Sequence, residues 1–129
     1  MTHLYEVLYV STLSDGLSPG VVARIAAQAR AANAAHGVTG LLVFDGQRFC
    51  QQLEGPQQAV FSTLGRIRND PRHTRLALLH HGPLAARRFS GFDLAFSAVD
   101  HADPLARMEQ LTGDEALAAF AAVCENLSL

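Results

Sequence analysis

The amino-acid sequence predicts an α+β domain with the element order β-α-β-β-α-β, followed by one further strand. Three observations support this order. Residues 4–11 are β-branched and aromatic with a period of two, and residues 18–35 carry apolar side chains at helical spacing. Asp45-Gly46, between two apolar runs, is a strong hairpin signal. This order is that of the ferredoxin-like fold, here an antiparallel or mixed five-stranded sheet with two helices on one face.

The first strand and the first helix have clear sequence signals. Alternation along residues 4–11 places Leu4, Glu6, Leu8 and Val10 on one face and Tyr5, Val7, Tyr9 and Ser11 on the other. Ser18 is the expected N-cap and Pro19 the first helical residue, and the helix runs to about Ala35, with Gly37 suited to a left-handed cap. Its core-facing stripe comprises Val22, Ile25, Ala26, Ala29 and Asn33.

A hairpin and a second helix follow. Residues 38–45 form a mostly apolar strand, and residues 48–54 return antiparallel to it. Gly55-Pro56 opens a helix that runs to about Asn69. Its apolar stripe comprises Val60, Phe61, Leu64 and Ile67.

The last third of the chain supplies two strands and a cover for the other sheet face. We expect strands over residues 76–81, ended by Gly82-Pro83, and over residues 92–99. A capping box at residues 112–115 begins a helix. Its apolar stripe comprises Leu117, Phe120, Ala121, Cys124 and Leu127. The sequence thus predicts a domain over residues 1–100 and, over residues 101–129, a C-terminal helical extension that covers the second face of the sheet.

Composition excludes several classes of protein. The 129 residues suggest one domain, 49% hydrophobic and 17% charged, with a net charge of −2. All ten basic residues are arginines and they form no run, so we expect no nucleic-acid partner. Cys50 and Cys124 lack metal-ligand spacing, which indicates reduced thiols in a cytoplasmic protein. We expect no signal peptide and no membrane span.

Gln51 interrupts the apolar alternation of its strand. A carboxamide on a buried face must find partners, because an unpaired buried amide costs about 1–3 kcal/mol. It carries two donors and an acceptor, and rotation exchanges them. The alternative is that Gln51 faces solvent while Gln52 or Cys50 faces the core.

If Gln51 faces the two helices, it converges with Tyr9 and Asn33 on a slot between them. We expect the slot to be lined by Ile25, Ala29 and Ile67, with Tyr5, Val7 and Tyr9 below. One phenol and two amides around an apolar cleft indicate a small-molecule site, in which isoleucines enclose a flat heterocycle. The alternative for Asn33 is a residue that hydrogen-bonds its own backbone near the helix end.

Other polar groups have weaker functional signals. Basic side chains at the end of the second helix could hold a phosphate tail, or could simply be a solvated helix end; they are Arg66, Arg68, Arg72 and His73. His80 and His81 are adjacent on a strand and point to opposite faces, so they chelate one metal poorly. Cys50 is expected to be a core residue on the sheet face away from the slot.

Five segments taken together resemble the BLUF domain, a blue-light sensor that uses flavin. They are residues 5–11, Asn33 with residues 37–42, residues 49–56, residues 70–73 and residues 87–89. The match runs in order over residues 3–98. Residues 101–129 resemble the C-terminal helices of short stand-alone BLUF proteins.

The resemblance implies a photoreceptor that is not an enzyme and that holds FAD, with FMN or riboflavin possible, between the two helices. Tyr9 matches the tyrosine that gives an electron to the excited flavin. Gln51 matches the glutamine that rearranges, and Asn33 the asparagine at the ring edge. The signal would pass to a separate downstream signalling protein or through a homo-oligomer.

Two departures from the family pattern affect the output step. Phe92 and Leu94 stand where the family commonly has tryptophan and methionine, and Gln52 stands where a hydrophobic residue is usual. We therefore hypothesise a photoactive domain with altered or weak signal transmission. The rival hypotheses are a ferredoxin-like interaction module without chromophore and a flavin-dependent redox enzyme.

Overall fold

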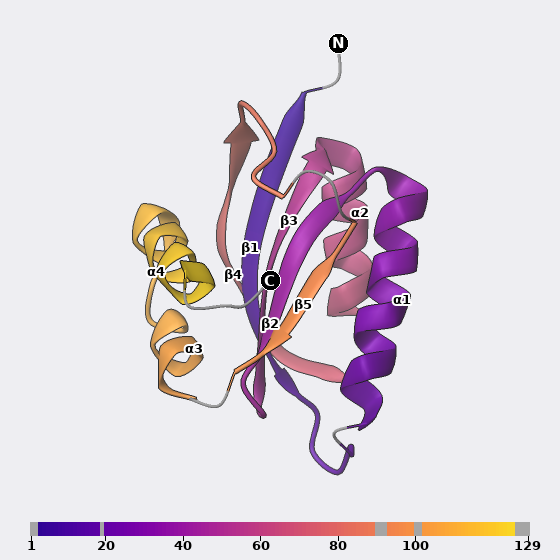
Figure 1. Cartoon of the computed structure of the whole chain (residues 1–129), viewed down its shortest axis with the longest axis vertical. Helices are drawn as coiled ribbons and strands as arrows, with labels where there is room; N and C mark the ends of the chain where they lie inside the picture. Colours follow the sequence, from indigo (N-terminus) through magenta and orange to yellow (C-terminus); the bar gives the residue numbers. More distant parts are fainter. Residues whose placement is uncertain (1–2, 19, 90–92, 100–101, 126–129) are drawn as a thin grey trace.

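The computed structural model describes residues 3–18, 20–89, 93–99 and 102–125. Strands and helices follow one another in the predicted order, with two short helices at the end (Figure 1). The elements are β1 (Leu4–Leu13), α1 (Gly20–His36), β2 (Thr39–Phe44), β3 (Arg48–Pro56), α2 (Gln57–Arg68), β4 (His73–Leu84), β5 (Ala95–Ala98), α3 (Asp103–Met108) and α4 (Gly113–Glu125). Among the described residues, no helix has the length and hydropathy needed to cross a bilayer.

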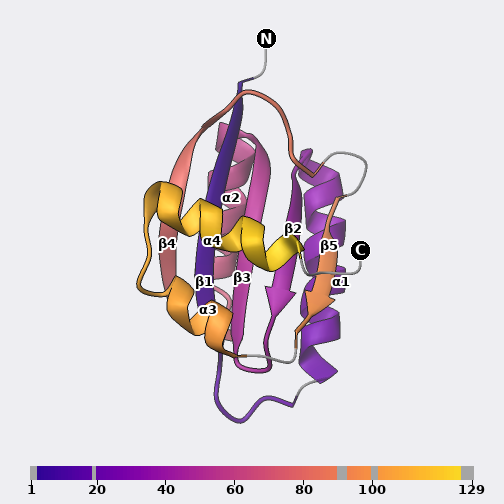
Figure 2. The same cartoon turned by 60° about the vertical axis from the view of Figure 1, so that its left-hand side comes forward.

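The sheet has five strands in the order β4-β1-β3-β2-β5. β1 pairs antiparallel with β3 and β4, and β2 pairs antiparallel with β3 but parallel with β5. Helices α1 and α2 cover one face, and α3 and α4 lie across the other (Figures 1 and 2). The predicted ferredoxin-like fold with a mixed sheet is therefore confirmed.

The alternation of β1 assigns its side chains to the two faces as predicted. Val7 and Tyr9 pack in a cluster with Val60 and Leu64 of α2. Leu8 and Val10 pack in the cluster that α3 and α4 cover. The two layers exist because successive side chains of a strand point to opposite faces.

The last two strands differ from their predicted bounds. β4 extends beyond residues 76–81 at both ends, and Gly82-Pro83 stay within it, with Pro83 opposite Tyr5. β4 is an edge strand, where proline needs no partner on the outer side. β5 is shorter than residues 92–99, and Phe92 lies outside the described residues.

Two apolar stripes also differ from prediction. Phe61 of α2 is 37% exposed and packs on the ring of Tyr5, so it does not belong to the core. In α4 Phe120 is buried and Leu117 and Cys124 pack against the same cluster, as predicted, whereas Ala121 is exposed and Leu127 lies outside the described residues.

Gly40 brings β2 close to β3 beside the candidate site. A Cβ at Gly40 would lie 2.4 Å from the carbonyl oxygen of Gln52, whereas a Cβ at Gly65 in α2 would meet no atom within 4 Å. Gly40→Ala should lower the free energy of unfolding by about 1–3 kcal/mol because two central strands must separate. Gly65→Ala, the matched control, should raise it by about 0.5–1 kcal/mol through helix propensity. Urea unfolding measures both, and equal stability of the two variants would contradict the close approach.

Candidate functional site

A cavity of about 260 Å³ lies between α1, α2 and the sheet. Its lining comes from α1 (Ile25, Gln28, Ala29, Ala32, Asn33), from the sheet (Tyr9, Leu42, Gln51) and from α2 with the segment after it (Thr63, Arg66, Ile67, Asp70, Arg72, His73). Nine of the residues expected at the slot or its mouth are among them, whereas Tyr5, Val7 and Arg68 are not. The slot inferred from strand and helix periodicity is therefore a real cavity.

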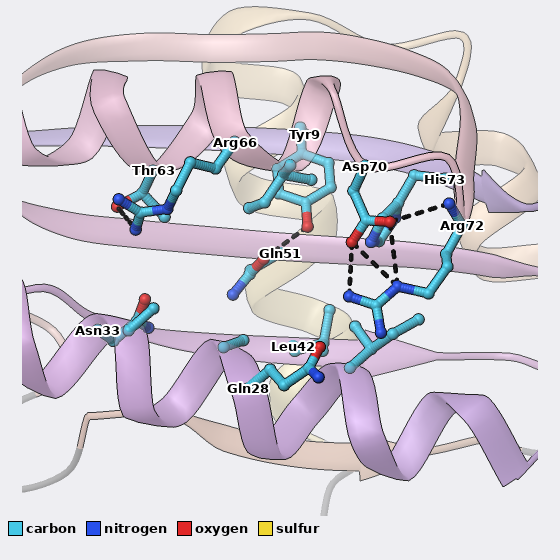
Figure 3. Close-up of a pocket in the computed structure, with 14 residues that line it drawn as sticks. Tyr9, Gln28, Asn33, Leu42, Gln51, Thr63, Arg66, Asp70, Arg72 and His73 are labelled. Atoms are coloured by element: carbon cyan, nitrogen blue, oxygen red, sulfur yellow. Dashed lines mark hydrogen bonds and ion pairs between the residues drawn. The ribbon is translucent and has the colours of Figure 1, made fainter.

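Tyr9 and Gln51 form a buried pair at the floor of the cavity (Figure 3). They are opposite one another in the register of β1 and β3, on the same face, and are 1% and 2% exposed. The Tyr9 hydroxyl donates to Gln51 Oε1 over 2.5 Å. Burial, followed by the nearby Cys50 and Asp70, raises the pKa of Tyr9 far above its ordinary value, so the phenol stays protonated and remains a donor.

The solvent-facing alternative for Gln51 is wrong. Gln52 is also buried, on the other sheet face, where its Nε2 donates to Glu6 Oε1 over 2.8 Å. Cys50 lies on that face too, in the core cluster beneath α3 and α4, as predicted. Burial raises the pKa of the Cys50 thiol well above its ordinary value, which leaves it unreactive.

Asn33 reaches across to the segment before β5 and does not bond its own helix. Its Nδ2 donates to the carbonyl oxygen of Asp93 over 3.0 Å. Among the described residues, Asn33 Oδ1 and Gln51 Nε2 are both buried without a hydrogen-bond partner. The cavity thus presents one unpaired acceptor, Asn33 Oδ1, and one unpaired donor, Gln51 Nε2. These two atoms could pair with the edge of a heterocycle that carries both an N–H and a carbonyl.

The apolar walls agree only in part with the prediction. Ile25 and Ile67 line the cavity from opposite helices, as expected for residues on the two faces of a flat ring. Tyr5 does not line it: its hydroxyl lies 2.6 Å from His81 Nδ1, and its ring packs against Phe61. Val7 packs under α2 and is also absent from the lining.

The basic side chains at the cavity mouth are less available to bind a phosphate than the sequence suggests. Arg72 donates from Nε and Nη2 to both carboxylate oxygens of Asp70, and Arg72 lowers the Asp70 pKa through this hydrogen bond (Figure 3). Arg66 is exposed and donates to Thr63 Oγ1, and Arg68 does not line the cavity. Sequence reasoning missed Asp70 as a site residue, although it adjoins Arg72 in the segment 70–73.

His73 is a buried residue of the cavity lining. Its Nδ1 lies 3.0 Å from Ser11 Oγ and its ring centroid 4.6 Å from that of Phe49. Burial lowers its pKa below the ordinary 6.5, with Asp70 opposing and Arg72 adding to the effect. The imidazole is therefore neutral at neutral pH and is poorly suited to hold a phosphate.

The lowered pKa of His73 predicts how stability depends on pH. Below pH 6.5 His73 binds a proton in the unfolded chain but stays neutral in the folded chain. The free energy of unfolding therefore falls as the pH drops from 6.5 towards the pKa of His73 in the folded protein. Denaturant unfolding at pH 7.5 and 5.5 measures this loss. His73→Gln should reduce this loss, and an unchanged pH dependence in that variant would contradict the assignment.

The two adjacent histidines of β4 point to opposite faces, as predicted. His80 Nε2 lies 3.3 Å from Glu6 Oε2 on the face of α3 and α4, whereas His81 contacts Tyr5. Within the described residues, no group of three or more His, Cys, Asp or Glu side chains could hold a metal ion.

The fold and the cavity define a class of protein: an α+β domain with a cavity between two helices, above a buried tyrosine–glutamine pair, whose lining suits a flat heterocycle. The family model "Sensors of blue-light using FAD" matches residues 4–95. The chain belongs to this BLUF family of flavin-binding blue-light sensors.

Relatives and solved structures agree with this assignment. Photoactivated adenylate cyclase subunit beta of Euglena gracilis is 37% identical over 86 residues, which cover 67% of this chain and 10% of the relative. The blue light- and temperature-regulated antirepressor BluF of Escherichia coli K12 is 34% identical over 86 residues, 67% of this chain and 21% of the relative. The chain therefore spans only about a tenth to a fifth of the length of these relatives. The dark-state structure of the BLUF protein BlrB has a TM-score of 0.82 and 26% identity, covering 98% of this chain and 99% of BlrB.

Proposed function

We propose that this chain senses blue light through Tyr9 and Gln51, with the flavin held in the cavity between α1 and α2. The observation that carries the proposal is the buried 2.5 Å hydrogen bond from Tyr9 to Gln51, beside the unpaired Gln51 Nε2 and Asn33 Oδ1. A protein core without a ligand rarely leaves two such atoms unpaired, because each costs about 1–3 kcal/mol. FAD is the flavin named by the family, and FMN and riboflavin carry the same ring.

The residues around the cavity fit a flavin ring by their chemistry. Gln51 Nε2 can donate to a ring carbonyl and Asn33 Oδ1 can accept from a ring N–H, which fixes the edge of the ring. Ile25 and Ile67 can pack on its two faces. The tail would leave through the mouth, where Arg66 is exposed and Arg72 is already paired with Asp70.

Tyr9 is the proposed electron donor and Gln51 the switch. The bound flavin supplies the blue-light absorption and, once excited, the electron-accepting group. Tyr9 would give up an electron to that group, and its hydroxyl proton would move along the hydrogen bond towards Gln51 Oε1, because an oxidised phenol is a strong acid. Once the electron and the proton had returned to Tyr9, the amide of Gln51 could settle in its other orientation, with donor and acceptor exchanged.

We further propose that residues 1–100 form the sensing unit and that residues 101–129 form an extension through which output passes. α3 and α4 pack on the sheet face opposite the cavity, so a change in the sheet reaches them directly. The chain would act by contact with a separate signalling protein or a second copy of itself, and would not turn over a substrate.

An absorption spectrum before and after illumination tests the proposal. The purified, flavin-loaded protein should be yellow and should show a small, reversible red shift under blue light. A loaded sample without a shift would reject photoactivity. A colourless protein that takes up no added flavin would instead support the rival hypothesis of an interaction module without chromophore.

A further inference from the structure

A cluster of polar side chains lies on the sheet face opposite the cavity, with Glu6, Gln52 and Glu54 buried and the half-exposed Arg88 at its edge. Its centre is Glu6 of β1, which is 4% exposed. Glu6 Oε1 accepts from Gln52 Nε2 and from Arg88 Nη1, and Glu6 Oε2 lies 3.3 Å from His80 Nε2. Buried carboxylates need such donors because an unpaired buried charge is strongly destabilising.

A second buried glutamate fixes the segment that carries Arg88. Glu54 is 0% exposed; its Oε2 accepts from the Arg88 amide over 2.9 Å and its Oε1 from the Phe89 amide over 2.8 Å. Arg88 therefore joins both carboxylates, one through its side chain and one through its backbone. Phe89 in turn packs against the apolar cluster that includes Leu105 and Phe120 of the C-terminal helices.

Gln52 connects this cluster to the photoactive glutamine. Gln51 and Gln52 share one peptide unit in β3, a strand flanked on both sides, and their side chains leave it towards opposite faces. A shift of the backbone at Gln51 therefore displaces Gln52. Since Glu6 would lose a buried hydrogen bond if Gln52 moved alone, Glu6 and Arg88 are expected to follow.

We propose that Gln52 is a positioning residue for the light response, which passes a displacement at Gln51 through the sheet to Glu6, Arg88 and Phe89, and so to the C-terminal helices. This inference rests on the proposed function. It gives the polar side chain of Gln52 a role in transmitting the light signal to the C-terminal helices. It also provides a route that does not need Leu94, whose apolar side chain packs in a core cluster that includes Val22 and Ile25 of α1.

Amide hydrogen exchange of the flavin-loaded full chain, in the dark and under blue light, tests the route. In the wild type, light should change the exchange rates of the Arg88 and Phe89 amides by about fivefold or more, the lower end of coupling between sites. Gln52→Met, which keeps the length but not the donor, should keep the red shift and lose the light-dependent exchange at these two amides. Gln58→Met, exposed at the start of α2, is the matched control and should behave as the wild type.

A second variant keeps the test decisive if Gln52→Met does not fold. Arg88→Met removes the contact to Glu6 from the other end and should also abolish the light-dependent exchange while keeping the red shift. Unchanged exchange differences in either variant, or none in a wild type that shows its red shift, would overturn the relay. Absence of the red shift in the wild type would instead reject the proposed function itself.

Discussion

Replacing Tyr9 with Phe should leave a yellow, flavin-loaded protein that no longer changes its spectrum under blue light. The ring is retained, so packing at the cavity floor and flavin binding should survive. The hydroxyl that donates to Gln51 is lost, and with it the proposed electron and proton donor. The buried Gln51 Oε1 loses its partner as well, which should lower the free energy of unfolding by about 1–3 kcal/mol.

Tyr5 offers a matched control for this variant, because it is the other of the two tyrosines in the chain. Its hydroxyl contacts His81 near the surface and it does not line the cavity. Tyr5→Phe should therefore keep the full red shift. A Tyr9→Phe protein with an unchanged shift would place the electron donor elsewhere.

Replacing Gln51 with Leu should also abolish the red shift, for a different reason. Leucine fills similar space but offers neither donor nor acceptor, so no hydrogen bond can rearrange around the ring edge. Losing one hydrogen bond to the flavin should weaken its binding by about tenfold or less. Titration of flavin into the apoprotein and light-minus-dark spectra measure the two effects.

Flavin fluorescence separates the proposed roles of these two residues. With Tyr9 present as electron donor, Gln51→Leu should keep the emission quenched, whereas Tyr9→Phe should raise it. Gln58→Leu, on the exposed surface of α2, should change neither emission nor red shift. Strong emission from Gln51→Leu would show that the glutamine, and not the phenol alone, is needed for electron transfer.

Local patterns in the sequence were sufficient to predict both helices, the hairpin and the side-chain faces of β1. A period of two along a strand and of 3.6 along a helix decides which side chains share a face, so the sequence allowed Tyr9, Gln51 and Asn33 to converge on one slot. The face of Gln51 stayed open until the structure placed all three at the cavity. Gly37, with a φ of 70°, stands at the end of α1 as its position in the sequence indicates.

Local sequence patterns do not say which strands are neighbours in the sheet. The strand order decided the remaining features of the structure. Glu6 and Gln52 meet only because β1 lies beside β3, and Pro83 remains in β4 only because β4 is at the edge of the sheet. Periodicity in the sequence thus determined the face to which each side chain points. Only the tertiary structure determined which side chains are hydrogen-bond or ion-pair partners, because these interactions depend on contacts between segments distant along the chain.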